Sequence, residues 1–282
     1  MFTALLFTAT LMSSGSKPAT HSTVPSCCVG MEKFASDPQF VAAHLAPTLI
    51  SFKPSSGKNV TFPDAMGRPT TGFYVAGKAG SKVGIVMVHE WWGLNDHIRQ
   101  EAERLHEVTG YAFLAVDLYE GKSTTVPADA GKLMSMVEAT RAKAIVKSAV
   151  NSLKNGRFGF KASKIGTIGY CFGGGWSYQT AVAGGSKVDA CVMYYGMPDT
   201  SLDALNALRA PVLMIWGKED KWINADVVSK FEAAMKGVHK PLRTIGYEAD
   251  HGFANPSNPK FNAQATAAAN SETLKFWRKH LG

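Results

Sequence analysis

Cys171 occupies a position typical of a catalytic nucleophile. It lies in the segment Gly169-Tyr170-Cys171-Phe172-Gly173, which follows an apolar stretch and precedes a helical pattern. In the nucleophile elbow, G-x-S-x-G, the nucleophile sits at a sharp strand-to-helix turn, and small residues flank it because neighbouring backbone comes close. Cysteine here replaces serine, and the positive end of the following helix favours its thiolate. The motif alone also fits a glycine-rich turn around a buried, unreactive cysteine. Its spacing matches neither of the common phosphate-binding glycine motifs.

Asp220 and His251 are the predicted partners of Cys171. In enzymes that use this elbow, an acid and then a histidine follow the nucleophile along the chain. Asp220 comes after the apolar run Pro211–Trp216, and His251 comes after the next apolar run. Both therefore follow strands, at the edge where open parallel sheets bind ligands. Cysteine would supply a thiolate, histidine would transfer the proton, and aspartate would fix the imidazole tautomer.

Two neighbouring carboxylates compete with Asp220 for this role. Glu219 directly precedes Asp220, and Asp250 directly precedes His251. Asp220 is favoured because it holds the loop position after the strand, whereas Asp250 adjoins the histidine itself.

The elements that must position these groups alternate between strand and helix. Strands are predicted at 59–62, 71–76, 82–89, 111–116, 164–169, 188–195, 211–216 and 242–247. The first two, separated by turn residues, indicate an antiparallel hairpin. The remaining strands alternate with helices, which predicts a mostly parallel, doubly wound α/β sheet with helices on both faces and no separate cap domain.

Five helices are predicted in the same part of the chain. Asn95 caps the first, whose apolar face is expected to hold Ile98, Ala102, Leu105 and Val108. The others cover 128–154, 173–183, 224–236 and 262–280. The last helix is expected to present Ala267, Leu274, Trp277 and Leu281 on one side.

The chain divides into three predicted parts. Residues 1–30 form a signal-like or flexible segment, 31–58 an N-terminal extension with one short helix, and 59–282 the catalytic domain. The apolar stretch Met1–Met12 resembles the core of a secretory signal, but no Lys or Arg precedes it, and it is too short to span a bilayer. Because of the resemblance to a signal sequence, export to the periplasm or medium is predicted, and a cytoplasmic protein is the alternative. No membrane partner is expected beyond this segment.

Composition and charge exclude several other classes. With 45% apolar and 10% aromatic residues among 282, the chain can bury a sizeable core. The 30 Lys and Arg outnumber the 22 Asp and Glu, but they are scattered, so no nucleic-acid partner is expected. Cys27 and Cys28 are adjacent, and Cys191 lies within a predicted buried strand. The cysteines lack zinc-ligand spacing, and hydrolysis by a thiol nucleophile requires no metal or cofactor, so neither is predicted.

Taken together, the sequence resembles the dienelactone hydrolase family of the α/β-hydrolase superfamily. The resemblance covers about residues 60–282 and rests on the segments 88–93, 117–119, 169–174 and 194–196 and on the surroundings of Asp220 and His251. It implies an α/β-hydrolase fold and an ester-hydrolysing enzyme without a cofactor. It also implies that Glu90 contacts the resting Cys171 and helps form its thiolate. The backbone N–H groups of Trp91 and Phe172 would form the oxyanion hole.

Departures from the family pattern bear on the substrate. The family's carboxylate-binding arginines are missing from 252–255 and from about 127–131. A carboxylate would lose its bidentate partners there. Aromatic side chains are instead expected to line the pocket: Trp91, Trp92, Tyr119, Trp222 and Phe253.

These features favour neutral or aromatic esters and lactones as small-molecule substrates, with activated phosphotriesters as a promiscuous activity. The alternatives are a true carboxymethylenebutenolidase of aromatic catabolism, an acyltransferase, or a non-catalytic binding relative with an inert cysteine. The expected oligomeric state is a monomer or a homodimer.

Overall fold

A sheet of eight strands organises the protein. The computed structural model describes Met1 and residues 30–282. The strands are β1 (Gly57–Pro63), β2 (Pro69–Val75), β3 (Val83–Val88), β4 (Ala112–Val116), β5 (Lys164–Tyr170), β6 (Ala190–Tyr194), β7 (Val212–Gly217) and β8 (Leu242–Tyr247). Their order across the sheet is β1-β2-β4-β3-β5-β6-β7-β8. The β1–β2 and β2–β4 pairs are antiparallel, and all other pairs are parallel. The predicted α/β sheet with an opening hairpin is confirmed.

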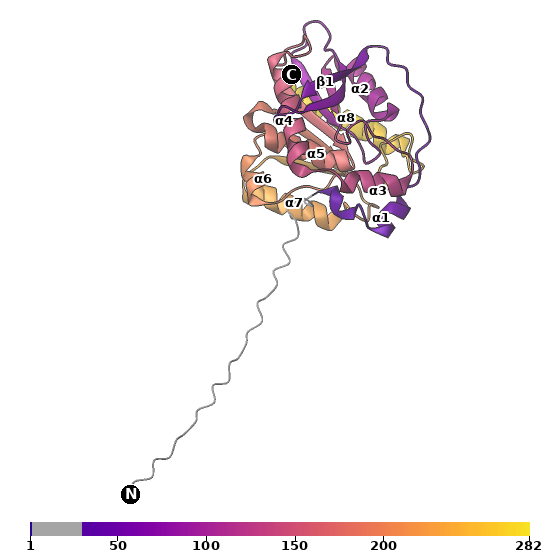
Figure 1. Ribbon diagram of the computed structural model, residues 1–282, viewed down its shortest axis with the longest axis vertical. Helices are drawn as coiled ribbons and strands as arrows, with labels where there is room; N and C mark the ends of the chain where they lie inside the picture. The colour runs from indigo at the N-terminus through magenta and orange to yellow at the C-terminus, as the bar shows by residue number, and fades with distance from the viewer. Residues whose placement is uncertain (2–29) are drawn as a thin grey trace.

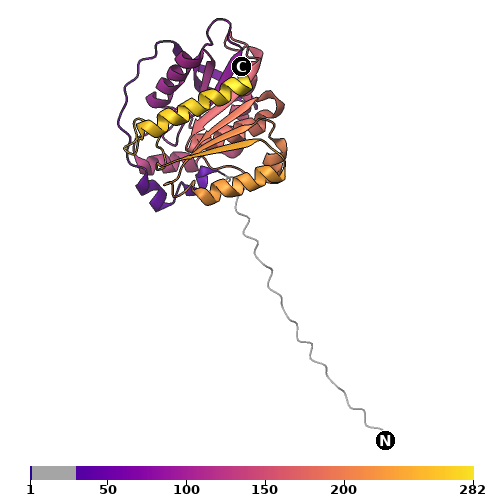
Figure 2. The ribbon, with the colours of Figure 1, turned by 180° about the vertical axis from the view of Figure 1, so that it is seen from behind.

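Helices cover both faces of this sheet. They are α1 (Pro38–Ala43), α2 (Asp96–Thr109), α3 (Pro127–Ser135), α4 (Ala139–Asn155), α5 (Phe172–Gly184), α6 (Leu202–Ala207), α7 (Ala225–Gly237) and α8 (Ala263–Leu281), with short 3-10 turns η1 (Met31–Phe34) and η2 (Gly185–Lys187). Helices α4 and α5 pack side by side on one face (Figure 1). Seen from behind, α8 crosses the opposite face, where it packs on the central strands β5, β6 and β7 (Figure 2).

Local sequence explains the central elements. Every residue of β3 and β4 is buried, as expected for strands with helices on both sides. Helix α2 begins at Asn95, whose side chain accepts a hydrogen bond from the backbone N of Ile98 at 3.2 Å. It ends at Gly110, which adopts the left-handed conformation (φ 71°) of a helix C-terminus.

Several details of the sequence prediction are wrong. The predicted helix 128–154 is broken into α3 and α4 between Ser135 and Ala139. Helix α3 packs against the N-terminal residues, whereas α4 packs against the sheet. The two segments therefore have different packing partners, and one continuous helix does not form. Val108 of α2 is 58% exposed, although the other three predicted positions of its apolar face are buried. Ala267 of α8 is likewise exposed, because the buried face runs through Ala265 and Ala269 instead.

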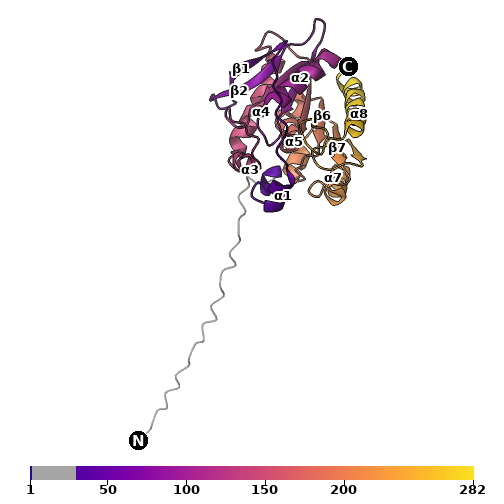
Figure 3. The same cartoon turned by 90° about the vertical axis from the view of Figure 1, so that its right-hand side faces the viewer.

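The N-terminal residues from Met31 onward pack against the rest of the protein. Helix α1 begins at Asp37, which accepts a hydrogen bond from the backbone N of Gln39, and Pro38 occupies its first turn. Turn η1 contacts α3 and α5, and α1 contacts α3, as the side view shows (Figure 3). Phe40 is fully buried. These residues therefore lie directly on the helices that follow β4 and β5.

The predicted signal-like segment, with Cys27 and Cys28, falls almost wholly outside the described residues, and its export stays a prediction. The three-part division of the chain and the oligomeric state also stay predictions. Within the described part of the chain, no helix combines the length and apolar character needed to cross a membrane.

Candidate active site

Cys171 lies at a strained turn between β5 and α5. Its backbone has φ 55° and ψ −118°, a conformation that non-glycine residues adopt only when the surrounding structure enforces it. Its backbone N donates a hydrogen bond to the carbonyl of Tyr194 at 3.0 Å, which ties the turn to the end of β6. The side chain is buried, with the residue only 2% exposed. This is the geometry of a nucleophile elbow.

Glycines on both sides allow the turn. A Cβ atom at Gly169 would overlap the backbone of Gly173, and one at Gly173 would overlap the backbone carbonyl oxygens of Val88 and His89. Strand β3, the elbow and helix α5 therefore approach one another more closely than any side chain would permit.

Asp220 and His251 meet beside this turn. Asp220 follows β7 and His251 follows β8, and the Nδ1 atom of His251 lies 2.6 Å from Oδ2 of Asp220. The other Asp220 oxygen accepts hydrogen bonds from the backbone N of Trp222 at 2.8 Å and of Ile223 at 2.9 Å. The carboxylate is thus fixed on both oxygens. With Nδ1 bonded to Asp220, the Nε2 atom of His251 is free to face Cys171.

The two alternative carboxylates are engaged elsewhere. Asp250 forms an ion pair with Lys260 at 2.7 Å, and Glu219 is exposed on the loop. Neither has a hydrogen bond to the ring of His251 among the described residues.

The electrostatics of the pair favour a charged imidazole. Burial lowers the pKa of His251, but the Asp220 carboxylate and Cys171 outweigh it and hold that pKa well above its usual value. Burial raises the pKa of Asp220, but the His251 charge and hydrogen bonds outweigh it and leave that pKa below its usual value. A proton taken from Cys171 would therefore be held on His251.

Glu90 lies two residues beyond β3 and is almost fully buried, with 4% exposed. Its Oε2 atom accepts a hydrogen bond from the side-chain amide of Asn255. Burial raises its pKa to about 7, although Asn255 acts in the opposite direction. No hydrogen bond joins Glu90 to Cys171 among the described residues, and the role that the family resemblance implies for Glu90 stays a prediction.

The two expected oxyanion donors lie in the loop after β3 and at the start of α5. Phe172 is the first residue of α5, so its N–H has no partner within the helix. The backbone N–H of Trp91 has no backbone partner among the described residues. Both N–H groups are therefore available to an oxyanion.

The aromatic residues expected to line the pocket pack on different neighbours. The ring centroid of Trp222 lies 6.3 Å from that of His251. Trp91 and Trp92 pack edge to face, with centroids 4.7 Å apart, and Tyr119 packs on the ring of Phe172 at 5.4 Å.

Phe253 has no ring packing on His251 among the described residues. It is fully buried between Tyr195 and Tyr247, with ring centroids 5.5 Å and 5.8 Å away. Tyr195, not Phe253, packs on the His251 ring, at 5.1 Å.

His44, which the sequence analysis did not single out, also reaches this site. It follows α1, and its ring centroid lies 4.5 Å from Trp91 and 5.0 Å from His251. Burial and the charge of His251 lower its pKa to about 3, so the ring is neutral at physiological pH. The Asp37-Pro38 pair signals the start of α1, but no sequence pattern places the residue that follows the helix against Cys171.

Phe40 lies over the site beside His44. Its ring packs against Trp91 at 5.4 Å and Trp222 at 5.2 Å. Phe40 and His44 therefore cover part of the site, and His251 is only 3% exposed.

Comparisons with known proteins agree with the fold. Residues 72–281 match the dienelactone hydrolase family. Protein usf of Aquifex pyrophilus is 35% identical over 162 residues, which cover 55% of this chain and 69% of that protein. Carboxymethylenebutenolidase 1 of Cupriavidus pinatubonensis is 26% identical over 224 residues, which cover 75% and 88% of the two chains.

A solved structure with a similar fold is the dienelactone hydrolase-like promiscuous phosphotriesterase from metagenomic libraries. It superposes with a TM-score of 0.67 at 18% identity, over 80% of this chain and 99% of that one. The sheet order and the elbow define an α/β-hydrolase. Within that superfamily, the chain belongs to the dienelactone hydrolase family, and it is an enzyme that hydrolyses ester or lactone bonds of small molecules.

Proposed function

We propose that the protein hydrolyses neutral or aromatic carboxylic esters and lactones through a covalent acyl group on Cys171. The observation that carries this proposal is the 2.6 Å contact between His251 Nδ1 and Asp220 Oδ2. It orients the imidazole so that Nε2 can accept the proton of Cys171. This Nε2 atom is buried and has no hydrogen-bond partner in the described part of the chain.

In the acylation step, His251 Nε2 takes the thiol proton and the Cys171 sulfur attacks the substrate carbonyl. The negative charge that forms on the carbonyl oxygen is stabilised by the N–H groups of Trp91 and Phe172, an effect typically worth a few kcal/mol. Collapse of this intermediate breaks the carbon–oxygen bond. The alcohol leaves with the proton from His251, and a thioester remains on Cys171.

In the hydrolysis step, His251 Nε2 accepts a proton from water, which attacks the thioester carbonyl. The same two N–H groups stabilise the second oxyanion. Its collapse breaks the carbon–sulfur bond and releases the carboxylic acid, and the departing Cys171 sulfur takes back the proton from His251 Nε2. Asp220 stays ionised and stabilises the imidazolium in both steps.

Glu90 is proposed to help form the thiolate when substrate arrives. Burial raises its pKa to about 7, so this carboxylate is a stronger base than a solvated glutamate and a better acceptor for the thiol proton. Since Glu90 is bonded to Asn255, this role requires its carboxylate to turn toward Cys171.

The preference for uncharged substrates is supported by the arginines beside Tyr119. Arg68 and Arg141 line a cavity that Tyr119 also borders. Arg141 forms an ion pair with Glu120 at 2.9 Å, and Arg68 lies 3.4 Å from Asp64. Both guanidinium groups already pair with carboxylates, which offsets part of their attraction for an anionic lactone.

Activated phosphotriesters are proposed as a promiscuous second substrate class. A developing P–O⁻ needs the same kind of N–H donors as a carbonyl oxyanion. The structural likeness to a promiscuous phosphotriesterase of the same fold is consistent with this activity.

Steady-state turnover of p-nitrophenyl acetate, an activated phosphotriester and an anionic dienelactone tests these proposals. Cys171→Ala should abolish turnover of the first two substrates. Cys191→Ala, which alters an equally buried cysteine in β6, should keep it. Undiminished turnover in Cys171→Ala would remove this residue from the mechanism. A strong preference for the anionic lactone would instead favour a true carboxymethylenebutenolidase.

A further inference from the structure

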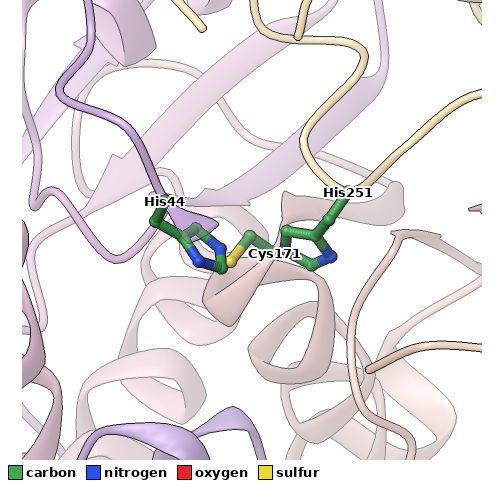
Figure 4. A group of neighbouring side chains, drawn as sticks. All are labelled: His44, Cys171 and His251. Carbon is green, nitrogen blue, oxygen red and sulfur yellow. The ribbon is translucent and has the colours of Figure 1, made fainter. Parts of the chain in front are cut away.

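His44 converts the catalytic pair into a cluster of three converging donor atoms. A ring nitrogen of His44, Sγ of Cys171 and a ring nitrogen of His251 all lie within 4.8 Å of one another, and all three residues are buried. Figure 4 shows the two imidazole rings on either side of the sulfur. The three side chains come from distant parts of the chain: the end of α1, the elbow before α5 and the loop after β8.

Both histidines are held in the same way. Nδ1 of His44 lies 2.7 Å from the carbonyl oxygen of Phe40, and Nδ1 of His251 lies 2.6 Å from Oδ2 of Asp220. An oxygen acceptor at Nδ1 places a hydrogen there, so in the neutral ring, the form that binds a metal, the lone pair is on Nε2. The Nε2 atoms of both rings are buried and lack a hydrogen-bond partner in the described part of the chain.

This is the arrangement in which histidines bind metals. A metal-bound imidazole usually donates its second ring N–H to a carboxylate or a backbone carbonyl, which fixes the ring and strengthens its lone pair. Asp220 supplies the carboxylate and Phe40 supplies the carbonyl. The nucleophile and the base of a hydrolase need only one such histidine, so the second one calls for another explanation.

We propose that Nε2 of His44, Sγ of Cys171 and Nε2 of His251 form a binding site for Zn²⁺, with water as the fourth ligand. Zinc favours tetrahedral sites made of imidazole and thiolate. Calcium and magnesium require oxygen donors, which the cluster does not offer.

The geometry requires only a modest contraction. Bond lengths of about 2.0–2.1 Å to nitrogen and about 2.3 Å to sulfur place tetrahedral donors roughly 3.4–3.6 Å apart. Donors that now lie within 4.8 Å must therefore close by at most about 1.4 Å. Because His44 lies beyond the end of α1, a shift of this residue can close the site without moving the sheet.

Zinc binding and hydrolysis exclude each other at this site. As the zinc–sulfur bond forms, the Cys171 thiol gives its proton to solvent, and no group changes oxidation state. The metal then occupies both the nucleophile and the base, so the loaded protein is inactive until the zinc is removed. The inhibition rests on the proposed function, whereas the metal binding itself does not. The ligand His44 lies outside residues 72–281, the part of the chain that matches the family.

The test uses the full, tag-free chain with Cys27→Ser and Cys28→Ser as a common background, so that these two thiols give no metal signal. Zn²⁺ affinity is measured by calorimetry, and Co²⁺ binding by thiolate-to-cobalt charge-transfer absorption. We expect one Zn²⁺ per chain, a thiolate signal that is absent from Cys171→Ala, and hydrolysis that Zn²⁺ inhibits and a chelator restores.

Substitution of His44 tests whether this residue is a zinc ligand. His44→Ala should weaken Zn²⁺ binding at least tenfold, and His97→Ala, which alters a similarly buried histidine on α2, should bind zinc as the wild type does. His44→Gln and a thermal melt of each variant guard against misfolding. Equal zinc affinity in wild type and both His44 variants would overturn the proposal, as would a cobalt complex without a thiolate band.

The two proposals fail in different ways. Metal binding without any ester hydrolysis would refute only the function. Hydrolysis that depends on Cys171 but shows no zinc binding would refute only the metal site.

Discussion

Replacing Glu90 by glutamine should stabilise the protein at alkaline pH and do little at acidic pH. Glu90 is 4% exposed, and burial raises its pKa from 4.5 to about 7. The folded protein therefore keeps a proton that the unfolded chain has already lost between these two pH values. The contribution of Glu90 to stability is therefore fully present below pH 4.5 and is lost as the pH rises toward 7, because the buried carboxylate must ionise.

The magnitude follows from the width of that interval. About 2.5 pH units at about 1.4 kcal/mol each give a cost of about 3 kcal/mol once Glu90 is fully ionised. Glutamine keeps the shape and can still accept the hydrogen bond from Asn255, but it never ionises. Glu90→Gln should thus raise the free energy of unfolding by about 3 kcal/mol at pH 8, and by about 1 kcal/mol at pH 5.

Urea denaturation of wild type and variants at pH 5 and pH 8 measures this difference. Glu103→Gln is the control, because it should lower the free energy of unfolding, whereas Glu90→Gln should raise it. Burial would raise the pKa of Glu103, but hydrogen bonds from Ser55 and from the backbone N of Ser56 and Gly57 outweigh it and lower that pKa to about 2.

The Glu103 contribution is fully present above its unfolded pKa of 4.5 and is lost only as the pH falls toward 2. Its removal should cost about 3 kcal/mol at both pH 5 and pH 8. Equal effects of Glu90→Gln at the two pH values, or a loss of stability at pH 8, would refute the reasoning.

Three further substitutions probe the site and its cover. Asp220→Asn should lower kcat for p-nitrophenyl acetate by about 10⁴-fold, because the imidazole loses its tautomer control; a kcat within tenfold of wild type would argue against this role. Gly173→Ala should cost more than about 3 kcal/mol in a denaturation experiment, because its Cβ would overlap backbone oxygens, whereas Gly237→Ala, which meets nothing within 4 Å, should change stability by less than about 1 kcal/mol. Phe40→Ala should cost about 3–5 kcal/mol and speed the alkylation of Cys171 by iodoacetamide. Leu49→Ala, at a residue 81% exposed, should do neither, and unchanged alkylation in Phe40→Ala would mean that the extension does not limit access.

Much of the catalytic scaffold could be predicted because it depends on local signals. The apolar runs of β3 and β5, the Asn95 cap and the glycines around Cys171 each encode a strand, a helix start or a close approach. The chain order of nucleophile, acid and histidine then pointed to Asp220 and His251, which the fold brings together.

What sequence reasoning missed depends on long-range packing. No glycine or proline lies between Ser135 and Ala139, so periodicity alone could not separate α3 from α4. His44 is a single histidine after a short helix, and only the docking of α1 beside the site gives it a partner in Cys171. The hydrogen bond between Glu90 and Asn255 likewise joins residues that no motif connects.

Rapid-quench mass spectrometry with p-nitrophenyl acetate tests the assignment of Cys171 most directly. The wild-type protein is mixed with substrate, quenched in acid within the first turnover and digested, and its peptides are searched for an acetyl group. We predict one acetyl group on the peptide that contains Cys171, formed at least as fast as steady-state turnover. An acetyl group on a different residue, or none while turnover continues, would contradict the assignment of Cys171 as the nucleophile.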